Sequence, residues 1–224
     1  MSVLERLRGG LVVSCQPVDG GPMDRPGIVA AMARAAVAGG AAGLRIEGVE
    51  NLRATRPLVE VPVIGIVKRD LPGSPVRITV TAADAQALIA AGAEIVAYDA
   101  TPRPRTQARD DILAAILAGG ALAMADCADL ADGRAALAGG AAILGTTLSG
   151  YTGETATGEA GPDFELIREF RGLGAFVMAE GRLNTPERAA AAMRAGADAG
   201  TVGSALTRLE LVTGWFADAV RAGR

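Results

Sequence analysis

Apolar and small residues recur along the chain in one repeated arrangement. Five segments carry a small-residue hinge followed by an apolar run: AVAGGAAGLRI from Ala36, LIAAGAEIVAYD from Leu88, ILAGGALAMAD from Ile116, ALAGGAAILGTT from Ala136 and MRAGADAGTVGS from Met193. Each segment predicts the end of a helix, a glycine C-cap, a short turn and a buried strand. Helices and strands therefore alternate, which indicates parallel strands joined by crossover helices.

The same pattern predicts eight strands. The expected runs are LVVSCQ to Gln16, GLRI through Arg45, VIGIVK to Lys68, EIVAYD to Asp99, LAMAD to Asp126, AILGTT to Thr147, FVMAE to Glu180, and GTVGS to Gly203 and Ser204. Their spacing favours an α/β fold of the (β/α)8 TIM-barrel type over an open sheet, as a single compact domain over residues 1–224. The segments DLPGSPVRIT and YTGETATGEAGPD are expected as loops on the active face.

Composition narrows the classes of partner. Half of the 224 residues are hydrophobic and 21% are charged, which suits one large domain with a substantial core. The net charge of −3 and the scattered basic residues predict no nucleic acid or membrane surface as a partner. The longest uncharged run, 112–125, is interrupted by two glycines and is shorter than the roughly 18 residues of a membrane span. We see no signal peptide. Cys15 and Cys127 suit reduced buried thiols, so we expect a cytoplasmic protein.

Polar residues end most of the predicted strands. In a barrel of this type, the carboxyl ends of the strands and the loops after them form the active face. The strand-end residues expected around one cleft are Gln16, Arg45, Lys68, Asp99, Asp126 and Glu180.

The absence of histidine restricts the acid and base chemistry at this cleft. Lys68 is the strongest candidate for a base, because it follows a buried run and burial favours the neutral amine. Glu180 would orient this amine, so we expect the two residues to form a coupled proton-transfer pair. A salt bridge at the barrel mouth is the alternative. The chain offers no predicted metal site.

Two loops are candidate anion sites. Gly181 and Arg182 follow the seventh strand, whereas Gly203, Ser204 and Arg208 follow the eighth. Glycines allow backbone N–H groups to approach a phosphate, and this position in the fold is a frequent phosphate site. Each glycine can also be an ordinary turn residue. The stretch from Thr185 to Glu187 is typical of a helix N-cap followed by proline and an acidic residue.

Eight motifs in barrel order resemble those of one known family. They are VSCQ, GLRIEG, PVIGIVKRD, DATPRPR, MADC, TTLSGYTG, AEGRLNTPE and VGSALTR, and they cover the chain from about residue 11 to 216. This set is similar to the N-acylglucosamine-6-phosphate 2-epimerases, also called N-acetylmannosamine-6-phosphate 2-epimerases. The specificity of the resemblance lies in the ordered set of motifs.

The resemblance implies an isomerase of carbohydrate metabolism, acting in sialic acid degradation. Such an enzyme interconverts N-acetyl-D-mannosamine 6-phosphate and N-acetyl-D-glucosamine 6-phosphate without a cofactor. When the family's roles are carried over by matching motif, Lys68 would remove and return the C2 proton. Glu180 would position the Lys68 amine or neutralise its charge. The implied substrate contacts are Gln16, Arg45, Asp126, Gly181, Arg182, Gly203, Ser204 and Arg208. Asp99 and Arg103 fit a loop-stabilising ion pair equally well. The resemblance also implies a homodimer.

Two other functions remain open from the residues alone. A Schiff-base aldolase or lyase acting on a sugar phosphate would also place a lysine at a strand end. A non-catalytic sugar-phosphate-binding barrel would need the anion loops but not Lys68. At the C-terminus, LELVTGWFADAV has apolar residues at near-helical spacing. This pattern predicts packing against the barrel, with Trp215 and Phe216 at a subunit contact as the alternative.

Overall fold

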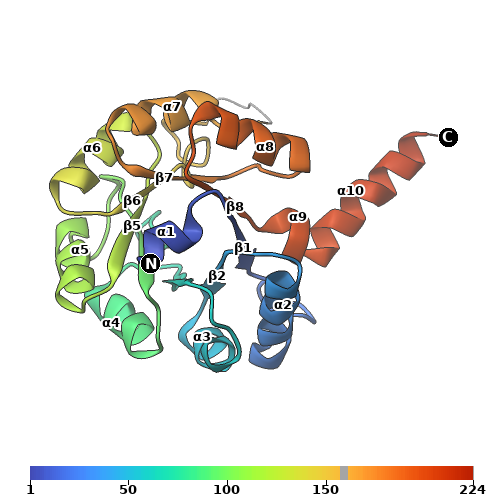
Figure 1. Ribbon diagram of the computed structural model, residues 1–224, viewed down its shortest axis with the longest axis horizontal. Coiled ribbons are helices and arrows are strands. Elements are labelled where there is room, and N and C mark those ends of the chain that lie inside the picture. Colours follow the sequence, from blue (N-terminus) through green and yellow to red (C-terminus); the bar gives the residue numbers. More distant parts are fainter. Residues whose placement is uncertain (157–160, 224) are drawn as a thin grey trace.

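Eight parallel strands form a closed barrel in the order β1 to β8 in the computed structural model, which describes residues 1–156 and 161–223 (Figure 1). The strands are β1 Leu11–Cys15, β2 Gly43–Glu47, β3 Val63–Ile66, β4 Ile95–Asp99, β5 Leu122–Asp126, β6 Ile143–Gly145, β7 Phe176–Glu180 and β8 Ala199–Val202. The predicted TIM barrel is confirmed. Strands β3 and β6 each stop two residues before their expected ends. Residues 157–160 of the second expected loop lie outside the described residues.

Helices surround the barrel and alternate with its strands (Figure 1). They are α2 Pro26–Ala38, α3 Val49–Thr55, α4 Ala82–Ala90, α5 Arg109–Ala118, α6 Leu130–Ala138, α7 Phe164–Gly172 and α8 Pro186–Ala195, with a 3-10 turn at Arg56–Leu58. Thr185 caps α8 by accepting a hydrogen bond from the Arg188 N–H, and Pro186 opens the helix, as its sequence predicted.

The five repeated hinges share one backbone feature. After each helix a glycine adopts a positive φ, and these glycines are Gly40, Gly92, Gly120, Gly140 and Gly196. Residues with a Cβ rarely adopt this conformation, so the glycine ends the helix and turns the chain toward the next strand. The repeated sequence pattern therefore corresponds to one structural device used five times.

Alternate residues of each strand face opposite sides of the barrel wall. One buried cluster lies inside the barrel and includes Val12, Ile64, Ile95 and Phe176. Their neighbours, such as Val13 and Val63, belong to the larger cluster between the sheet and the helices. This period of two means that the inward positions of all eight strands form layers along the barrel axis.

A short N-terminal helix, α1 Val3–Leu7, closes the amino end of the barrel (Figure 1). Leu7 is fully buried and belongs to the interior cluster. Gly43 makes room for it, because a Cβ at that position would lie 2.5 Å from the Leu7 Cδ2. Ser2 and Glu5 form a capping box that stabilises the first turn. The pocket can therefore open only at the other end.

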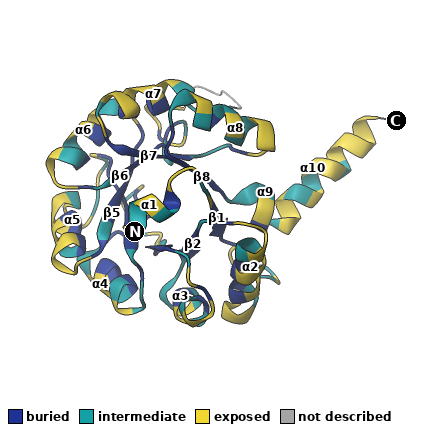
Figure 2. Cartoon of the chain, in the orientation of Figure 1, coloured by how far each residue is buried: buried dark blue, intermediate teal, exposed yellow. Residues whose placement is uncertain are grey.

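The C-terminal segment differs from its prediction. Strand β8 is followed by α9 Ser204–Thr207 and by α10 Leu209–Ala222, which extends away from the barrel (Figure 1). Helix α10 contains no buried residue, so the expected packing against the barrel is wrong (Figure 2). Its apolar side chains remain exposed, with Phe216 at 69% and Val220 at 64%.

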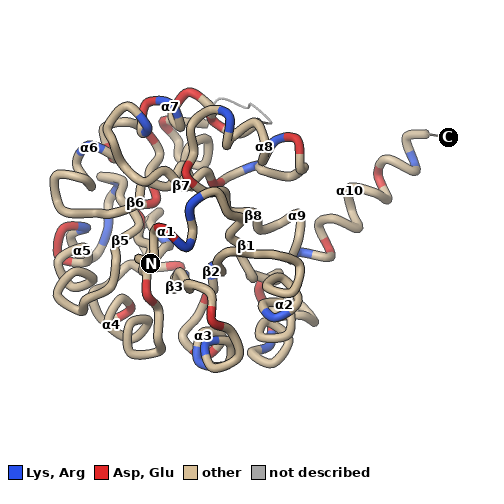
Figure 3. The backbone as a smooth tube through the Cα atoms, in the orientation of Figure 1, with Lys and Arg blue, Asp and Glu red and all other residues tan. Residues whose placement is uncertain are grey.

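Basic and acidic residues are interspersed over the ring of helices in the view of Figure 3. No helix within residues 1–156 and 161–223 combines the length and the apolar character needed to cross a membrane.

Candidate active site

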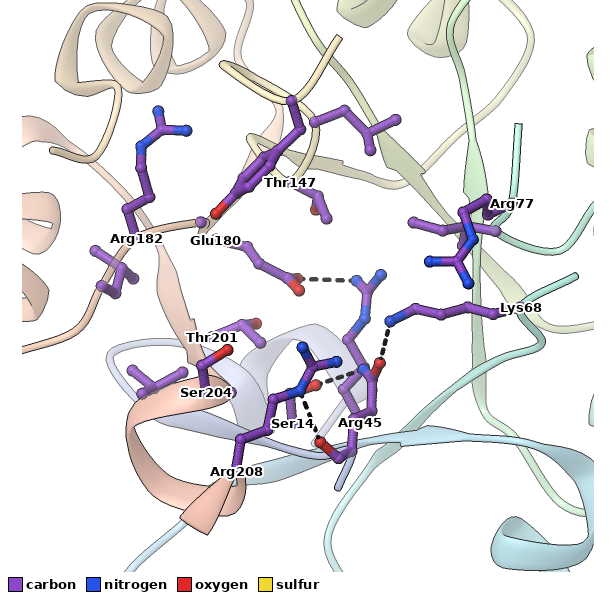
Figure 4. Close-up of a pocket in the computed structure, with 18 of the residues that line it drawn as sticks. Ser14, Arg45, Lys68, Arg77, Thr147, Glu180, Arg182, Thr201, Ser204 and Arg208 are labelled. Carbon is purple, nitrogen blue, oxygen red and sulfur yellow. Dashed lines mark hydrogen bonds and ion pairs between the residues drawn. The ribbon is translucent and has the colours of Figure 1, made fainter. Parts of the chain in front are cut away.

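A pocket of about 570 Å³ opens at the carboxyl ends of the strands (Figure 4). Nine of the ten predicted site residues line it, and they are Gln16, Arg45, Lys68, Glu180, Gly181, Arg182, Gly203, Ser204 and Arg208. Asp126 is the tenth and lies beneath the pocket surface. Residues more than 190 positions apart in the sequence thus meet in one cavity because all the strands are parallel.

Lys68 is half-buried just beyond the end of β3. Its Nζ donates a hydrogen bond of 2.6 Å to the Gln16 Oε1, and the Gln16 Nε2 in turn donates to the Ser14 Oγ at 2.6 Å. Burial lowers the pKa of Lys68, and the positive charges of Arg45 and Arg208 lower it further. Both effects make the neutral amine, which is the form that accepts a proton, easier to form than in water.

Lys68 is also the only lysine in the chain, which carries 21 arginines. Arginine stays protonated at accessible pH, so it cannot replace lysine as a base. This single occurrence was visible in the sequence and is a stronger indication of function than the position of Lys68 at a strand end.

Arg45 occupies the centre of the pocket floor and is 1% exposed. Its guanidinium makes two hydrogen bonds to the Asp126 carboxylate, of 2.6 and 3.2 Å, and one of 2.9 Å to the Glu180 Oε2. Although burial opposes a charge here, Asp126 and Glu180 raise the pKa of Arg45 above its ordinary value. The residue is therefore a fixed cation beside the pocket.

Glu180 is held at the end of β7. The Thr146 hydroxyl donates to the Glu180 carbonyl at 2.9 Å and accepts from the Glu180 N–H at 3.0 Å. Burial raises the pKa of Glu180 to about 7, and the nearby Asp126 charge adds to this effect while Arg45 opposes it. This carboxyl group can therefore exchange protons near neutral pH.

The expected direct pair of Lys68 and Glu180 is not present among the described residues. The Glu180 carboxylate instead contacts Arg45, whereas the Lys68 amine contacts Gln16 (Figure 4). Arg45 and its carboxylate partners thus form a unit beside the amine, and the positive charges of Arg45 and Lys68 both oppose the rise in the pKa of Glu180.

Asp126, which was predicted as a substrate contact, lies beneath the pocket surface. Its side chain is fully buried and accepts hydrogen bonds from Arg45 and from the Thr147 Oγ1, the latter at 2.6 Å. Gly145 gives these groups room, because a Cβ there would lie 2.9 Å from the Thr147 Oγ1 and 3.3 Å from the Asp126 Oδ1. Asp126 is therefore placed to act through Arg45.

The loop after β7, which was predicted as an anion site, begins with two residues of unusual backbone conformation. Gly181 and Arg182 both have positive φ values, of 102° and 56°. The Arg182 guanidinium donates to the carbonyl oxygens of Ser149 (2.8 Å) and Gly161, and it lies over the Tyr151 ring. This side chain therefore fastens the loop after β6 and is not directed at the pocket centre (Figure 4).

The loop after β8 retains the expected features of an anion site. Gly203 lies between β8 and α9, where a Cβ would stand 3.3 Å from the Ser14 Cβ. Ser204 begins α9. The Arg208 Nε donates to the Gln16 carbonyl at 3.1 Å, and its guanidinium points into the pocket (Figure 4). This loop therefore lets a phosphate approach the backbone at Gly203 and Ser204, and the Arg208 guanidinium supplies a positive charge.

Asp99 and Arg103 line the pocket but belong to a loop network. The buried Asp99 carboxylate accepts hydrogen bonds from Thr101, Arg103 and Arg105. This arrangement matches the loop-stabilising alternative. Sequence patterns did not predict the pocket residues Arg77 and Tyr151, which lie in loops, or Leu211 and Trp215, which lie in the first half of α10.

A family profile described as "Putative N-acetylmannosamine-6-phosphate epimerase" matches residues 29–222. The chain belongs to this epimerase family. Among relatives named "Putative N-acetylmannosamine-6-phosphate 2-epimerase", the Pasteurella multocida protein is 56% identical over 222 residues, covering 99% of this chain and 96% of its own. The Haemophilus ducreyi protein is 57% identical with the same coverage.

Among solved structures, the N-acetylmannosamine-6-phosphate 2-epimerase from Clostridium perfringens superposes with a TM-score of 0.93 at 37% identity, covering 98% of this chain and 96% of that one. A thiamine phosphate pyrophosphorylase from Pyrococcus furiosus has a TM-score of 0.64 at 17% identity, with 92% and 90% covered. The second likeness concerns the fold alone.

Proposed function

We propose that this member of the epimerase family interconverts N-acetyl-D-mannosamine 6-phosphate and N-acetyl-D-glucosamine 6-phosphate. The family membership and the names of relatives that span nearly the whole chain support the substrate pair. The observation that carries the chemistry is the chain's only lysine, half-buried in the pocket with its pKa lowered by burial.

Epimerisation at C2 requires only proton transfer and stabilisation of the resulting anion. In the open-chain sugar the C2 proton lies next to the C1 aldehyde, which acidifies it. In our proposal the Lys68 amine takes this proton, and the electron pair moves onto the C1 oxygen to give an enolate. Arg45 supplies a fixed positive charge for that oxygen. Return of the proton to the opposite face of C2 gives the epimer.

The other site residues take supporting roles in this proposal. Asp126 and Glu180 hold the Arg45 guanidinium, and Gln16 orients the Lys68 amine through its 2.6 Å hydrogen bond. The loop of Gly203 and Ser204 receives the phosphate together with Arg208. Gly181 borders this end of the pocket.

Proton NMR in D₂O tests the proposed reaction. The purified protein is mixed with N-acetylmannosamine 6-phosphate, and Lys68→Met serves as the comparison. We expect the gluco epimer to appear with deuterium at C2 and to be absent with the variant. A folded wild-type protein that leaves this substrate unchanged would contradict the proposal. Covalent trapping of the substrate on Lys68 by borohydride would indicate Schiff-base chemistry instead.

We also propose a homodimer in which α10 supplies contact surface. This helix has no buried residue, and Leu209, Phe216 and Val220 are each more than 60% exposed. Exposed apolar faces of this kind mark protein contacts. Analytical ultracentrifugation should show a dimer that Phe216→Ser weakens, whereas Leu117→Ser, at an exposed site on α5, leaves it intact. A monomeric wild-type protein at micromolar concentration would contradict this part.

The free thiols support a reducing compartment. Cys15 and Cys127 are both buried and unpaired, so we propose the cytoplasm as the location. Fractionation of cells that express a tagged chain tests this assignment.

A further inference from the structure

The segment after β3 returns to the barrel and lies between β3 and β4 at the active end. The pairing of β3 with β4 ends at Gly65 and Val96. Beyond this point Ile78 forms an antiparallel bridge with Lys68, and the Ile78 carbonyl accepts from the Asp99 N–H at 3.2 Å. We call residues 76–80 the strap. On the side of β4 the backbone around Lys68 is therefore bonded to the strap, whereas on the side of β2 the Lys68 N–H donates to the Glu47 Oε1 at 3.2 Å.

Thr79 is the most constrained residue of the strap. It is fully buried and has a φ of +46°. Among the residues the structure describes, only Thr79 and Arg182 combine a side chain with a positive φ. A β-branched residue in this conformation is strained and persists only where its surroundings hold it.

The contacts that hold Thr79 connect the two separated strands. Its N–H donates to the Val67 carbonyl at 2.7 Å, and its hydroxyl donates to the Ala97 carbonyl at 2.6 Å. The same hydroxyl oxygen lies 3.4 Å from the Val67 N–H. Val67 directly precedes Lys68. Thr79 thus links Val67, the neighbour of Lys68, to Ala97 in β4.

We propose that Thr79 is a positioning residue that fixes the backbone of Lys68 so that its amine meets the substrate in a reactive geometry. This inference rests on the proposed role of Lys68 as the base. The strain at Thr79 is understandable in these terms, since glycine would adopt the backbone without strain but could not bridge Val67 to Ala97. Catalysis depends steeply on such placement, because a displacement of about 1 Å can cost about a hundredfold in rate.

Three variants and one control test the proposal. Thr79→Val and Thr79→Gly both remove the hydroxyl, the first keeping the branched side chain and the second relieving the strain. Thr79→Ser retains the hydroxyl. Thr55→Val is the control, because Thr55 is a fully buried threonine on α3, outside the site, whose hydroxyl has no partner among the described residues.

Two readouts separate positioning from general stability. With the substrate, we expect kcat to fall between about tenfold and a hundredfold in the Val and Gly variants with KM changed less than about threefold. Thr79→Ser should restore most of the rate, and Thr55→Val should equal wild type.

The second readout does not depend on turnover. Because Lys68 is the only lysine, protein labelled with ¹⁵N at the lysine amine gives one side-chain signal. We expect its titration midpoint to move upward in the Val and Gly variants, because a loosened amine is better hydrated. The signal should stay unchanged in Thr55→Val.

The outcomes are distinct. Unchanged kcat and an unchanged lysine titration in a folded Thr79→Val or Thr79→Gly would overturn the proposal. Loss of thermal stability with neither change would show a merely structural role and would overturn it equally. If the wild-type protein does not turn over the substrate, the proposed function fails, whereas the lysine titration still decides whether Thr79 positions Lys68.

Discussion

The two ends of the barrel interior use the same strands in opposite ways. At the amino end the inward positions are apolar, as with Ile64 and Phe176, and Leu7 from α1 packs among them. Four residues further along the chain from each of these, the inward positions are Lys68 and Glu180. There the ion-pair unit of Arg45, Asp126 and Glu180 replaces the apolar layer. The strand pattern decides which residues face inward, and the distance along the strand decides whether they meet α1 or the open pocket.

Two glycines show the same contrast at the level of single atoms. Gly43 in β2 and Gly145 in β6 both lie where a Cβ would collide with a neighbour. At Gly43 that neighbour is Leu7 of the closing helix, whereas at Gly145 the neighbours are Met124, Thr147 and Asp126. One glycine therefore serves the stability of the closed end, and the other serves the geometry of the open end.

The largest expected effect comes from removing the proposed base of the open end while keeping a long basic side chain there. Lys68→Arg keeps a basic side chain but removes the only side-chain amine, the one group of this kind that can become neutral. We expect kcat/KM to fall by about 10²–10⁴-fold, with the melting temperature close to that of wild type. Coupled-assay kinetics and calorimetry measure the two quantities. Activity within a few-fold of wild type would exclude Lys68 as the base.

The next largest effect tests whether the ion-pair unit is held as a whole. Arg45→Met leaves two buried carboxylates without their partner, so we expect the free energy of unfolding to fall by about 3–5 kcal/mol. Denaturant titration measures this loss. Arg53→Met on α3 is the matched control, since Arg53 forms an exposed pair with Glu50 and should change stability by less than about 1 kcal/mol. Equal losses in the two variants would contradict the difference between buried and exposed pairs.

The two glycines allow one substitution to be compared at both ends. We expect Gly43→Ala to lower the free energy of unfolding by about 1–3 kcal/mol through overpacking against Leu7, with kcat retained. Gly145→Ala should lower kcat by about tenfold, because the added Cβ displaces the groups that hold Arg45.

Unfolding and steady-state kinetics on both variants provide the check. If kcat falls as much in Gly43→Ala as in Gly145→Ala while both proteins are folded, the proposed difference between the two ends of the barrel is wrong.

The smallest effect concerns pH. Burial raises the pKa of Glu180 to about 7 from an unfolded value of 4.5, so the folded protein binds more protons between these values. Its contribution to stability is therefore present below pH 4.5 and is lost as pH rises through 7. Relative to Glu180→Gln, the wild-type protein should lose on the order of 2 kcal/mol between pH 5 and 8. Chemical unfolding across this range measures the difference, and a gain in relative stability would give the wrong sign.

Features that repeat along the chain could be predicted from the sequence. The hinges after the helices, the eight strands and the polar strand ends all depend on local patterns, and they placed Lys68 and Glu180 at one opening. Contacts that depend on register between strands could not be predicted in this way. Arg45 separates Glu180 from Lys68 only because β2, β5 and β7 bring three inward side chains together.

Contacts between a side chain and a distant loop could not be predicted from local patterns either. Arg182 follows a strand end, as a phosphate-binding residue would. Its φ is positive, however, and its guanidinium donates hydrogen bonds to Ser149 and Gly161 in the loop after β6. The apolar spacing of α10 predicted a helix, but spacing alone says nothing about which surface covers it.

The single lysine has a practical consequence for chemical labelling of this protein. Reagents that modify lysine side chains can react with this chain only at Lys68, within the pocket. A bound substrate would shield this amine, so the extent of labelling would report the fraction of pockets that are occupied.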